Sequence, residues 1–210
     1  MKKLNSANIT ELLKKEYPEA ECSLTYKMPH ELLIATRLAA QCTDARVNIV
    51  TPALFARYTS PQEFAQAELA ELEALIASCG LFKTKARDII EMCKRLVEVY
   101  NGNVPDTMEE LLTLRGVGRK TANLILGDIY GKPAVVTDTH CIRISNRLGL
   151  ATSKDPLKVE NSLREAIEPE EQNDFCHRLV LHGRAVCTAR NPKCNVCSLN
   201  KVCPKVGVSK

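Results

Sequence analysis

Apolar residues along this chain recur with the three- and four-residue spacing of amphipathic helices. Leu32, Leu33, Thr36 and Ala40 form one such series, and the stretch 89–97 forms another. Only residues 134–136 look strand-like, and three residues are too few to found a sheet. The pattern predicts an all-α fold of about ten short helices joined by tight turns.

Helix-starting and helix-ending residues punctuate this pattern. The predicted starts are Ser60-Pro61, residues 105–107 and Asp155-Pro156. The predicted ends are Gly80, Asn101-Gly102, Gly131 and Gly149. From these breaks we expect two helical domains, one formed by residues 22–132 and the other by residues 1–21 together with 133–210. A cleft between two such domains is a natural place for a ligand.

Composition adds limits on location and oxidation state. At 210 residues and 45% hydrophobic content the chain resembles a soluble globular protein. No apolar run approaches the roughly 18–20 residues of a membrane span, and the N-terminus has no apolar signal core. We therefore expect a cytoplasmic protein with no membrane partner, taken as a monomer. Its ten cysteines are then expected to be reduced rather than joined in disulfides.

Four of these cysteines stand close together near the C-terminus. Cys187, Cys194, Cys197 and Cys203 follow the spacing C-x6-C-x2-C-x5-C, which allows four thiolates to surround one metal centre, either zinc or an iron–sulfur cluster. Residues 175–210 contain seven Lys or Arg and no Asp or Glu, although the whole chain is only +4. A metal-bound loop within a basic segment favours a polyanionic partner, most simply nucleic acid.

A second motif, the sequence from Leu114 to Ala122, predicts a turn between two helices. Gly116 and Gly118 permit close backbone approach, Val117 lies at the tip, and Arg119 opens the next helix. The free amides at that helix N-terminus suit a backbone phosphate of DNA. An ordinary helix connection with two glycines is the alternative interpretation.

These motifs together resemble a known family. The sequence L-x-G-V-G-R-K-T-A, followed by Val136-Thr137-Asp138-Thr139-His140, resembles the helix-hairpin-helix DNA glycosylases, with the hairpin at about residues 107–130. With the cysteine spacing added, the chain resembles the endonuclease III family from residue 29 to Cys203. The resemblance implies two helical domains flanking a DNA-binding cleft and a C-terminal loop holding a [4Fe–4S] cluster on the four cysteines.

The resemblance also implies base excision repair of oxidised pyrimidines in damaged duplex DNA. The amine of Lys120 would attack C1′ of the sugar, displace the base, and cut the strand by β-elimination through a Schiff base. Attack needs a neutral amine, which the positive end of the helix dipole favours. Asp138 would stabilise positive charge on the sugar. The alternatives are that Lys120 only grips phosphate and that Asp138 only caps the helix that begins at Thr139.

DNA opening and phosphate contacts are assigned by the same resemblance. Leu81 matches a wedge and Gln41 a gap-filling glutamine, although each also suits an ordinary helix end. The cations after the wedge, Lys83, Lys85 and Arg87, are expected either to meet phosphate or to form a solvated helix face. Arg190 and Lys193 are expected to present the cysteine loop to phosphate.

Two positions depart from the family pattern. Arg115 stands where relatives usually have proline, so we expect a looser turn entry that could gain a phosphate contact. Cys42 replaces a small, nonreactive residue and would be prone to oxidation if exposed.

Two rival functions remain open from the sequence. A monofunctional mismatch glycosylase of the same superfamily would lack the catalytic lysine and carry an extra C-terminal domain. A non-catalytic DNA-binding protein with a structural cluster would keep the hairpin and need neither Lys120 nor Asp138.

Overall fold

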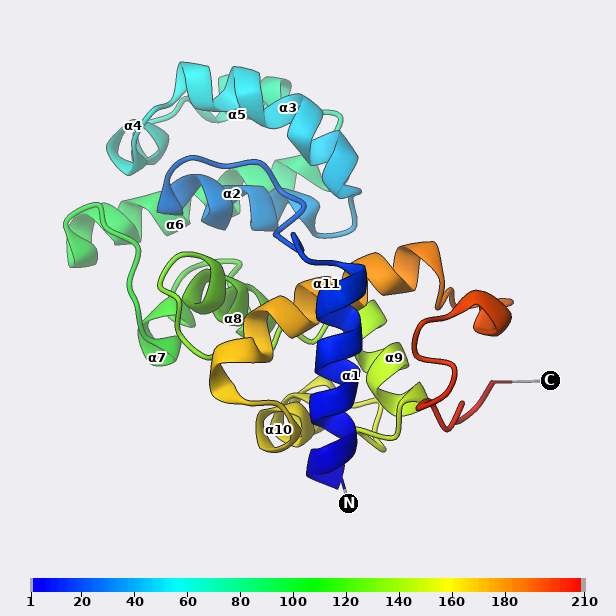
Figure 1. Cartoon of the computed structure of the whole chain (residues 1–210). Coiled ribbons are helices and arrows are strands. Elements are labelled where there is room, and N and C mark those ends of the chain that lie inside the picture. The colour runs from blue at the N-terminus through cyan, green and yellow to red at the C-terminus, as the bar shows by residue number, and fades with distance from the viewer. Residues whose placement is uncertain (1, 209–210) are drawn as a thin grey trace. The chain divides into compact units, whose positions relative to one another are not determined.

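The computed structural model describes residues 2–208, with side chains from residue 5 onward, and contains eleven α-helices and no strand over that range (Figure 1). The prediction of an all-α fold is confirmed. None of the helices in the described range combines the length and apolar character that a membrane span needs. The chain divides into two compact units, residues 22–130 and residues 1–21 together with 131–210.

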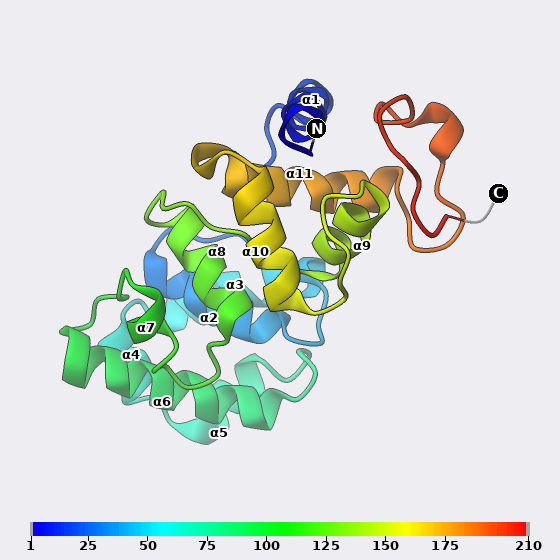
Figure 2. The same ribbon diagram turned by 90° about the horizontal axis from the view of Figure 1, so that it is seen from below.

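The unit of residues 22–130 contains seven helices, α2 to α8. Their bounds are Pro29–Ala39 (α2), Asp44–Arg57 (α3), Pro61–Ala65 (α4), Leu69–Leu75 (α5), Phe82–Tyr100 (α6), Met108–Leu111 (α7) and Arg119–Asp128 (α8). Helix α2 packs against α3, α6 and α8, and the long α6 also contacts α4 and α5. This central position explains why α2 is buried along most of its length. Figure 2 shows α2, α6 and α8 in a view turned by 90°.

The other unit contains four α-helices and two short 3-10 helices. Their bounds are Lys2–Glu16 (α1), Thr139–Arg147 (α9), Pro156–Ala166 (α10), Pro169–Glu171 (η1), Gln172–Ala185 (α11) and Cys194–Val196 (η2). Helix α11 packs against α1 and α9, and α10 packs against the same two helices. The C-terminal loop lies beyond the end of α11 in both views (Figure 1 and Figure 2).

Local sequence signals account for five of the helix starts. A hydroxyl or carboxylate at the N-cap accepts a hydrogen bond from a backbone amide of the first turn, which satisfies a donor that the helix itself leaves unpaired. Such N-caps are Thr43, Ser60, Thr107, Asp138 and Asp155. The starts predicted at Ser60-Pro61, at residues 105–107 and at Asp155-Pro156 are therefore confirmed.

The crossing of α9 and α11 depends on one glycine. A Cβ atom built on Gly183 would lie 2.3 Å from Nδ1 of His140 and 2.9 Å from Nη2 of Arg143. A larger residue there would displace the His140 and Arg143 side chains or α9 itself, so Gly183 allows the close approach of α11 to the helix that Asp138 caps.

Candidate functional site

The predicted hairpin joins α7 to α8 in the unit of residues 22–130. Leu111 and Leu114 are buried, and the amide of Val117 donates to the carbonyl of Leu114 at 3.1 Å, which closes the turn. Gly116 adopts φ +77°, in the left-handed region that favours glycine. Gly118 is the N-cap residue of α8 and offers no side-chain cap. The first turn of α8 thus receives no side-chain cap from its N-cap residue, and a helix N-terminus of this kind is a suitable place for a phosphate.

Lys120 lies in the first turn of α8, and its side chain is exposed. Over the described part of the chain, it makes no hydrogen bond or ion pair. Arg119 beside it is also exposed, whereas Val117 at the tip of the turn is half-buried. An exposed amine in the first turn of a helix can reach a substrate that binds the hairpin through its phosphates.

Arg115 is held by an ion pair at the entry to the hairpin. Its Nε donates to Oδ1 of Asp88 at 2.9 Å, while the Arg115 side chain remains 71% exposed. Asp88 itself is buried in α6. Sequence reasoning expected a looser turn at this position, whereas the structure ties the turn entry to α6. Asp88 belongs to no sequence motif, so nothing in the neighbouring sequence predicts its contact with Arg115.

Gln41 and Leu81 share an unusual backbone conformation. Gln41 has φ +55° and Leu81 has φ +59°, which is a left-handed backbone conformation that residues other than glycine rarely adopt. Both side chains are exposed, Leu81 by 58%. A Cβ atom on Gly80 would lie 3.6 Å from the carbonyl oxygen of Gln41, so the two turns are neighbours. Strained, exposed residues of this kind cluster at functional sites.

Of the three cations that follow Leu81, Lys85 does not behave as predicted. Lys83 and Arg87 are exposed, but Lys85 is fully buried and its Nζ donates to the carbonyl oxygen of Leu38 at 2.7 Å. Burial lowers the pKa of Lys85 because it disfavours the charged form, although the nearby Cys42 and Cys79 thiols act in the opposite direction. Lys85 therefore ties α6 to the end of α2 and meets neither solvent nor phosphate.

Asp138 caps α9 in the other unit. Its Oδ1 accepts a hydrogen bond from the amide of Cys141 at 2.6 Å, and the side chain is half-buried. The residues before it, from Ala134 to Thr137, are buried and lie outside any helix. The cap interpretation of Asp138 is thus correct as far as its position goes, and one carboxylate oxygen stays beyond that cap for other chemistry.

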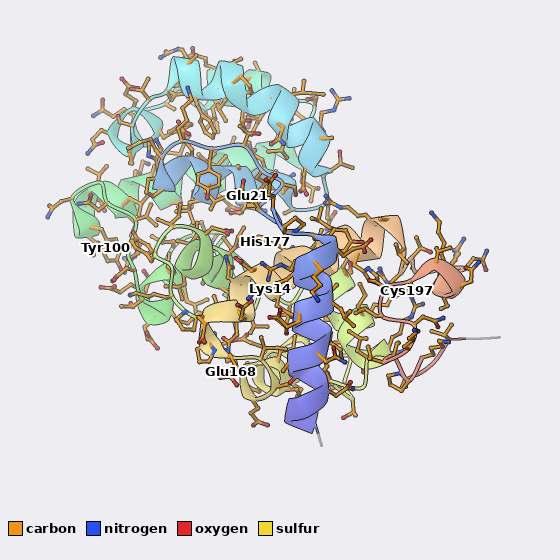
Figure 3. All side chains as sticks on the ribbon, viewed as in Figure 1. Lys14, Glu21, Tyr100, Glu168, His177 and Cys197 are labelled. Atoms are coloured by element: carbon orange, nitrogen blue, oxygen red, sulfur yellow. The ribbon has the colours of Figure 1, made fainter. Side chains whose placement is uncertain are left out.

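The four C-terminal cysteines line one small cavity, which is partly open to solvent. Arg147 and His182 line the same cavity. Figure 3 labels Cys197 in this loop. Among the described residues, no three His, Cys, Asp or Glu side chains converge tightly enough to hold a single ion. Four thiols around one cavity supply one thiolate for each of four irons, as a [4Fe–4S] cluster requires.

The charge that the four cysteines would carry as thiolates also favours a metal centre in this cavity. Burial raises the pKa of Cys197 and of Cys203, and the other cysteines of the loop raise both further. Four neighbouring thiolates consequently need a positive centre to offset their charge. Hydrogen bonds to sulfur add to the fit: Arg147 Nη1 donates to Sγ of Cys187 at 3.2 Å, and the Lys205 amide donates to Sγ of Cys203 at 3.3 Å.

Sequence reasoning missed the side chains that brace this loop. Arg143 donates to the carbonyl oxygen of Cys187 at 2.8 Å, and Arg147 donates to those of Thr188 at 2.8 Å and Ala189 at 3.0 Å. The two arginines are four residues apart on α9 and so face the loop together. Their spacing was visible in the sequence, but their target was not.

His182 is a second side chain that sequence reasoning missed. Its Nε2 lies 3.4 Å from Sγ of Cys197, and its Nδ1 lies 3.2 Å from the hydroxyl of Tyr17. The ring is buried, which lowers the pKa of His182. It therefore supports a cysteine of the loop rather than binding metal itself.

The two residues predicted to meet phosphate from this loop are both exposed. Arg190 lies in the turn that Thr188 closes by donating to the Arg190 carbonyl oxygen at 2.7 Å. Lys193 is partly committed, since its Nζ donates to the carbonyl oxygen of Ala185 at 3.1 Å. Arg190 is thus the better placed of the two for an external anion.

Comparison with known families supports what the hairpin and the loop indicate. Residues 34–169 match the HhH-GPD superfamily of base excision DNA repair proteins, and residues 187–203 match the iron–sulfur binding domain of endonuclease III. The second match begins at Cys187 and ends at Cys203, the outer two cysteines of the loop. Fold and site together define a base excision DNA repair protein of the helix-hairpin-helix class.

Individual relatives narrow the class. The chain is 48% identical to endonuclease III of Synechocystis sp., over 99% of this chain and 95% of the relative. It also matches a structure of a trapped endonuclease III–DNA covalent intermediate, with a TM-score of 0.89, 43% identity, and coverage of 95% of this chain and 96% of that one. A non-covalent endonuclease III–DNA complex matches with a TM-score of 0.91 and 43% identity, over 97% of this chain and 95% of that one. The chain belongs to the endonuclease III family.

Proposed function

We propose that this protein excises oxidised pyrimidines from damaged duplex DNA and then cleaves the resulting abasic site through Lys120. As a member of the endonuclease III family it is a base excision repair DNA glycosylase and abasic-site lyase. The observation that carries the assignment to Lys120 is its exposed, uncommitted amine in the first turn of α8, directly after the hairpin.

The chemistry assigned to Lys120 runs in two stages. Its neutral Nζ forms a bond to C1′ of the sugar while the bond from C1′ to the base breaks, and the base leaves with a proton. Loss of the amine proton and ring opening then form a Schiff base. Removal of a C2′ proton breaks the C3′–O bond by β-elimination, and water releases the enzyme.

Asp138 is assigned the role of stabilising the positive charge that develops on the sugar. Its Oδ1 is occupied by the Cys141 amide, so the proposal gives Oδ2 the role of stabilising positive charge and of passing protons. Capping and catalysis are compatible, because the cap fixes the carboxylate while leaving one oxygen for the substrate.

The DNA contacts are assigned to residues near the hairpin and the two strained turns. The amides around Gly116, Val117, Gly118 and Arg119 would bind a phosphate, and Leu81 with Gln41 would enter the duplex when the damaged base is turned out. Arg190 and Lys193 would add phosphate contacts from the cysteine loop. We further propose that the protein acts as a monomer on the DNA of the bacterial cytoplasm.

A [4Fe–4S] cluster is the cofactor of this family, and Cys187, Cys194, Cys197 and Cys203 are the residues proposed to hold it. When bound, such a cluster would stabilise the loop by offsetting the charge of the four thiolates, and with a cysteine on each iron it would leave no open position for substrate. The protein's own side chains do the rest: Arg143 and Arg147 hold the loop against α9, and the loop in turn presents Arg190.

Borohydride trapping on a duplex with one thymine glycol tests the proposal, with Lys120→Gln as the key variant. We expect a covalent adduct with the wild type and none with Lys120→Gln, while the variant still binds the duplex. Asp138→Asn should bind the duplex and trap far more slowly. An equal adduct from Lys120→Gln would refute the assignment, and no adduct from cluster-loaded wild type would favour a monofunctional glycosylase.

A further inference from the structure

Three segments of the unit 22–130 are proposed to touch DNA, and they are far apart in sequence. They are the turn at Gln41, the turn at Leu81 and the hairpin around Gly116. Opening a duplex requires them to act together, because the wedge and the glutamine must enter at a fixed distance from the phosphate held by the hairpin. Something in the structure has to fix their spacing.

The side chain that joins them is Asp88, two turns into the helix that Leu81 begins. Its Oδ2 accepts from Nε of Arg37 at 2.9 Å and from Nη2 at 2.5 Å. Its Oδ1 accepts from Nε of Arg115 at 2.9 Å. Arg37 lies in the last turn of α2, shortly before the turn at Gln41, and Arg115 enters the hairpin. One carboxylate thus contacts the elements that carry all three segments.

The hairpin also rests directly on this ion cluster. A Cβ atom on Gly116 would lie 2.8 Å from Cδ and Nε of Arg37 and 3.3 Å from Oδ2 of Asp88. The backbone of the turn is therefore packed on the Arg37–Asp88 pair, which leaves no space for the hairpin to move inward. Movement outward would break the bond from Arg115.

The burial of the cluster makes this contact stiff. Asp88 and Arg37 have side chains exposed by only 7% and 16%, so water cannot easily replace their hydrogen bonds. A buried carboxylate left without its partners is costly, which disfavours rearrangement of either arginine. The bond from Lys85 to the Leu38 carbonyl ties the same two helices one turn earlier along α6.

We propose that Asp88 is a positioning residue for DNA recognition, which holds the Gln41 turn, the Leu81 turn and the hairpin in one arrangement through Arg37 and Arg115. The inference rests on the proposed function, because it assumes that these three segments bind DNA. Arg115 has two roles in this proposal. Its Nε binds Asp88, and most of its side chain is exposed to solvent, where it can also contact a phosphate.

The test uses the full cluster-loaded protein with Asp88→Asn, Arg115→Gln and the double variant. Glu71→Gln is the matched control, because Glu71 also accepts two hydrogen bonds from an arginine, Arg57, in the same unit but on α3 and α5. Affinity is measured on a duplex with a stable abasic analogue. Base flipping is followed by the fluorescence of a 2-aminopurine placed next to thymine glycol. The single-turnover rate is measured at saturating DNA and divided by the fraction of enzyme that forms the borohydride-trapped adduct.

We expect Asp88→Asn to lower affinity about tenfold and the single-turnover rate by about tenfold to 100-fold, because small misplacements of a binding element are expensive in rate. Arg115→Gln should cause a smaller loss. That loss should shrink when Asp88→Asn is already present, because the two residues share one contact. Glu71→Gln should match wild type in flipping and rate.

Two results would overturn the inference. One is a folded Asp88→Asn protein that equals Glu71→Gln in all three measurements. The other is an Asp88→Asn protein with a lower melting temperature but a wild-type rate and flipping signal per trapped enzyme, which would make Asp88 a stabilising residue only. If Asp88→Asn does not fold, Arg115→Lys decides, because it keeps a cation for phosphate but loses the Nε donor that binds Asp88, and wild-type behaviour of that variant would overturn the inference. Absence of trapping by wild type would instead refute the proposed function.

Discussion

The hairpin and the cysteine loop are both proposed to face DNA phosphates, yet they are held by different means. The hairpin is fixed by buried leucines and by the ion cluster of Arg37, Asp88 and Arg115, all supplied by the polypeptide. The loop from Cys187 to Cys203 contains little regular structure beyond the three residues of η2 and is tied to α9 by arginine bonds to its carbonyl oxygens. The comparison teaches that the hairpin is held by protein contacts alone, whereas we expect the loop to need its cofactor as part of the fold.

The largest expected effect comes from removing a cluster ligand. Cys194→Ser should lose the visible chromophore completely and expose the loop and the end of α11, because three thiolates leave one iron without a protein ligand. The helices of residues 22–130 should keep their protection. Visible absorption with hydrogen exchange by mass spectrometry measures both. A colourless variant with a wild-type exchange pattern would show that the loop folds without the cluster. The hairpin and the loop would then not differ in how they are stabilised.

Next in size is a change in the hairpin. Gly116→Ala forces a side chain into φ +77° and places its Cβ 2.8 Å from Arg37, so we expect about 1–2 kcal/mol lower stability from the backbone strain alone. DNA affinity should fall as well, because the turn must lift off its support. Urea unfolding and fluorescence anisotropy measure the two effects.

Gly118→Ala is the control for the stability effect. Gly118 has φ −106°, and a Cβ atom there would meet nothing within 4 Å. Its unfolding free energy should stay close to wild type, even if its DNA binding changes. Equal destabilisation by both alanines would mean that the Arg37–Asp88 support is unimportant.

A smaller effect is expected from Arg147→Met, which tests how much the arginine bonds from α9 stabilise the cysteine loop. Loss of its bonds to the Thr188 and Ala189 carbonyl oxygens should weaken the loop by about 1–3 kcal/mol and shorten the life of the chromophore under a chelator. Arg190→Gln should instead keep the chromophore and weaken DNA binding, with a lower salt dependence. A long-lived chromophore in Arg147→Met would assign loop stability to the cysteines alone.

The smallest expected effect is a dependence on pH from the hairpin side. Burial alone would raise the pKa of Asp88, but the hydrogen bonds and charges of Arg115 and Arg37 outweigh burial and lower it. A lowered folded pKa means that Asp88 contributes stability above its unfolded value of about 3.9 and loses that contribution as pH falls through the lower folded value. Urea midpoints between about pH 6 and about pH 3 should therefore fall less steeply in Asp88→Asn than in wild type. Parallel curves would contradict this.

Predictions from the sequence succeeded where the signal and the structure it specifies lie within a few residues. The caps at Ser60, Thr107 and Asp155 and the turn at Gly116 are of this kind. The prediction for Lys85 was wrong because a cation on an amphipathic helix usually faces water, whereas α2 covers this one and supplies a carbonyl oxygen in place of solvent.

By itself, the sequence determined the all-α fold, the hairpin, the place of Lys120 directly after it, and the four cysteines of the loop. Each follows from helical spacing, capping chemistry or ligand spacing over short stretches of chain. The tertiary structure alone decided that Asp88 meets Arg37 and Arg115, 51 and 27 residues away, and that Arg143 reaches Cys187 across 44 residues. The physical reason is that a hydrogen bond between distant residues depends on how helices pack, and packing is a property of the whole core rather than of any segment.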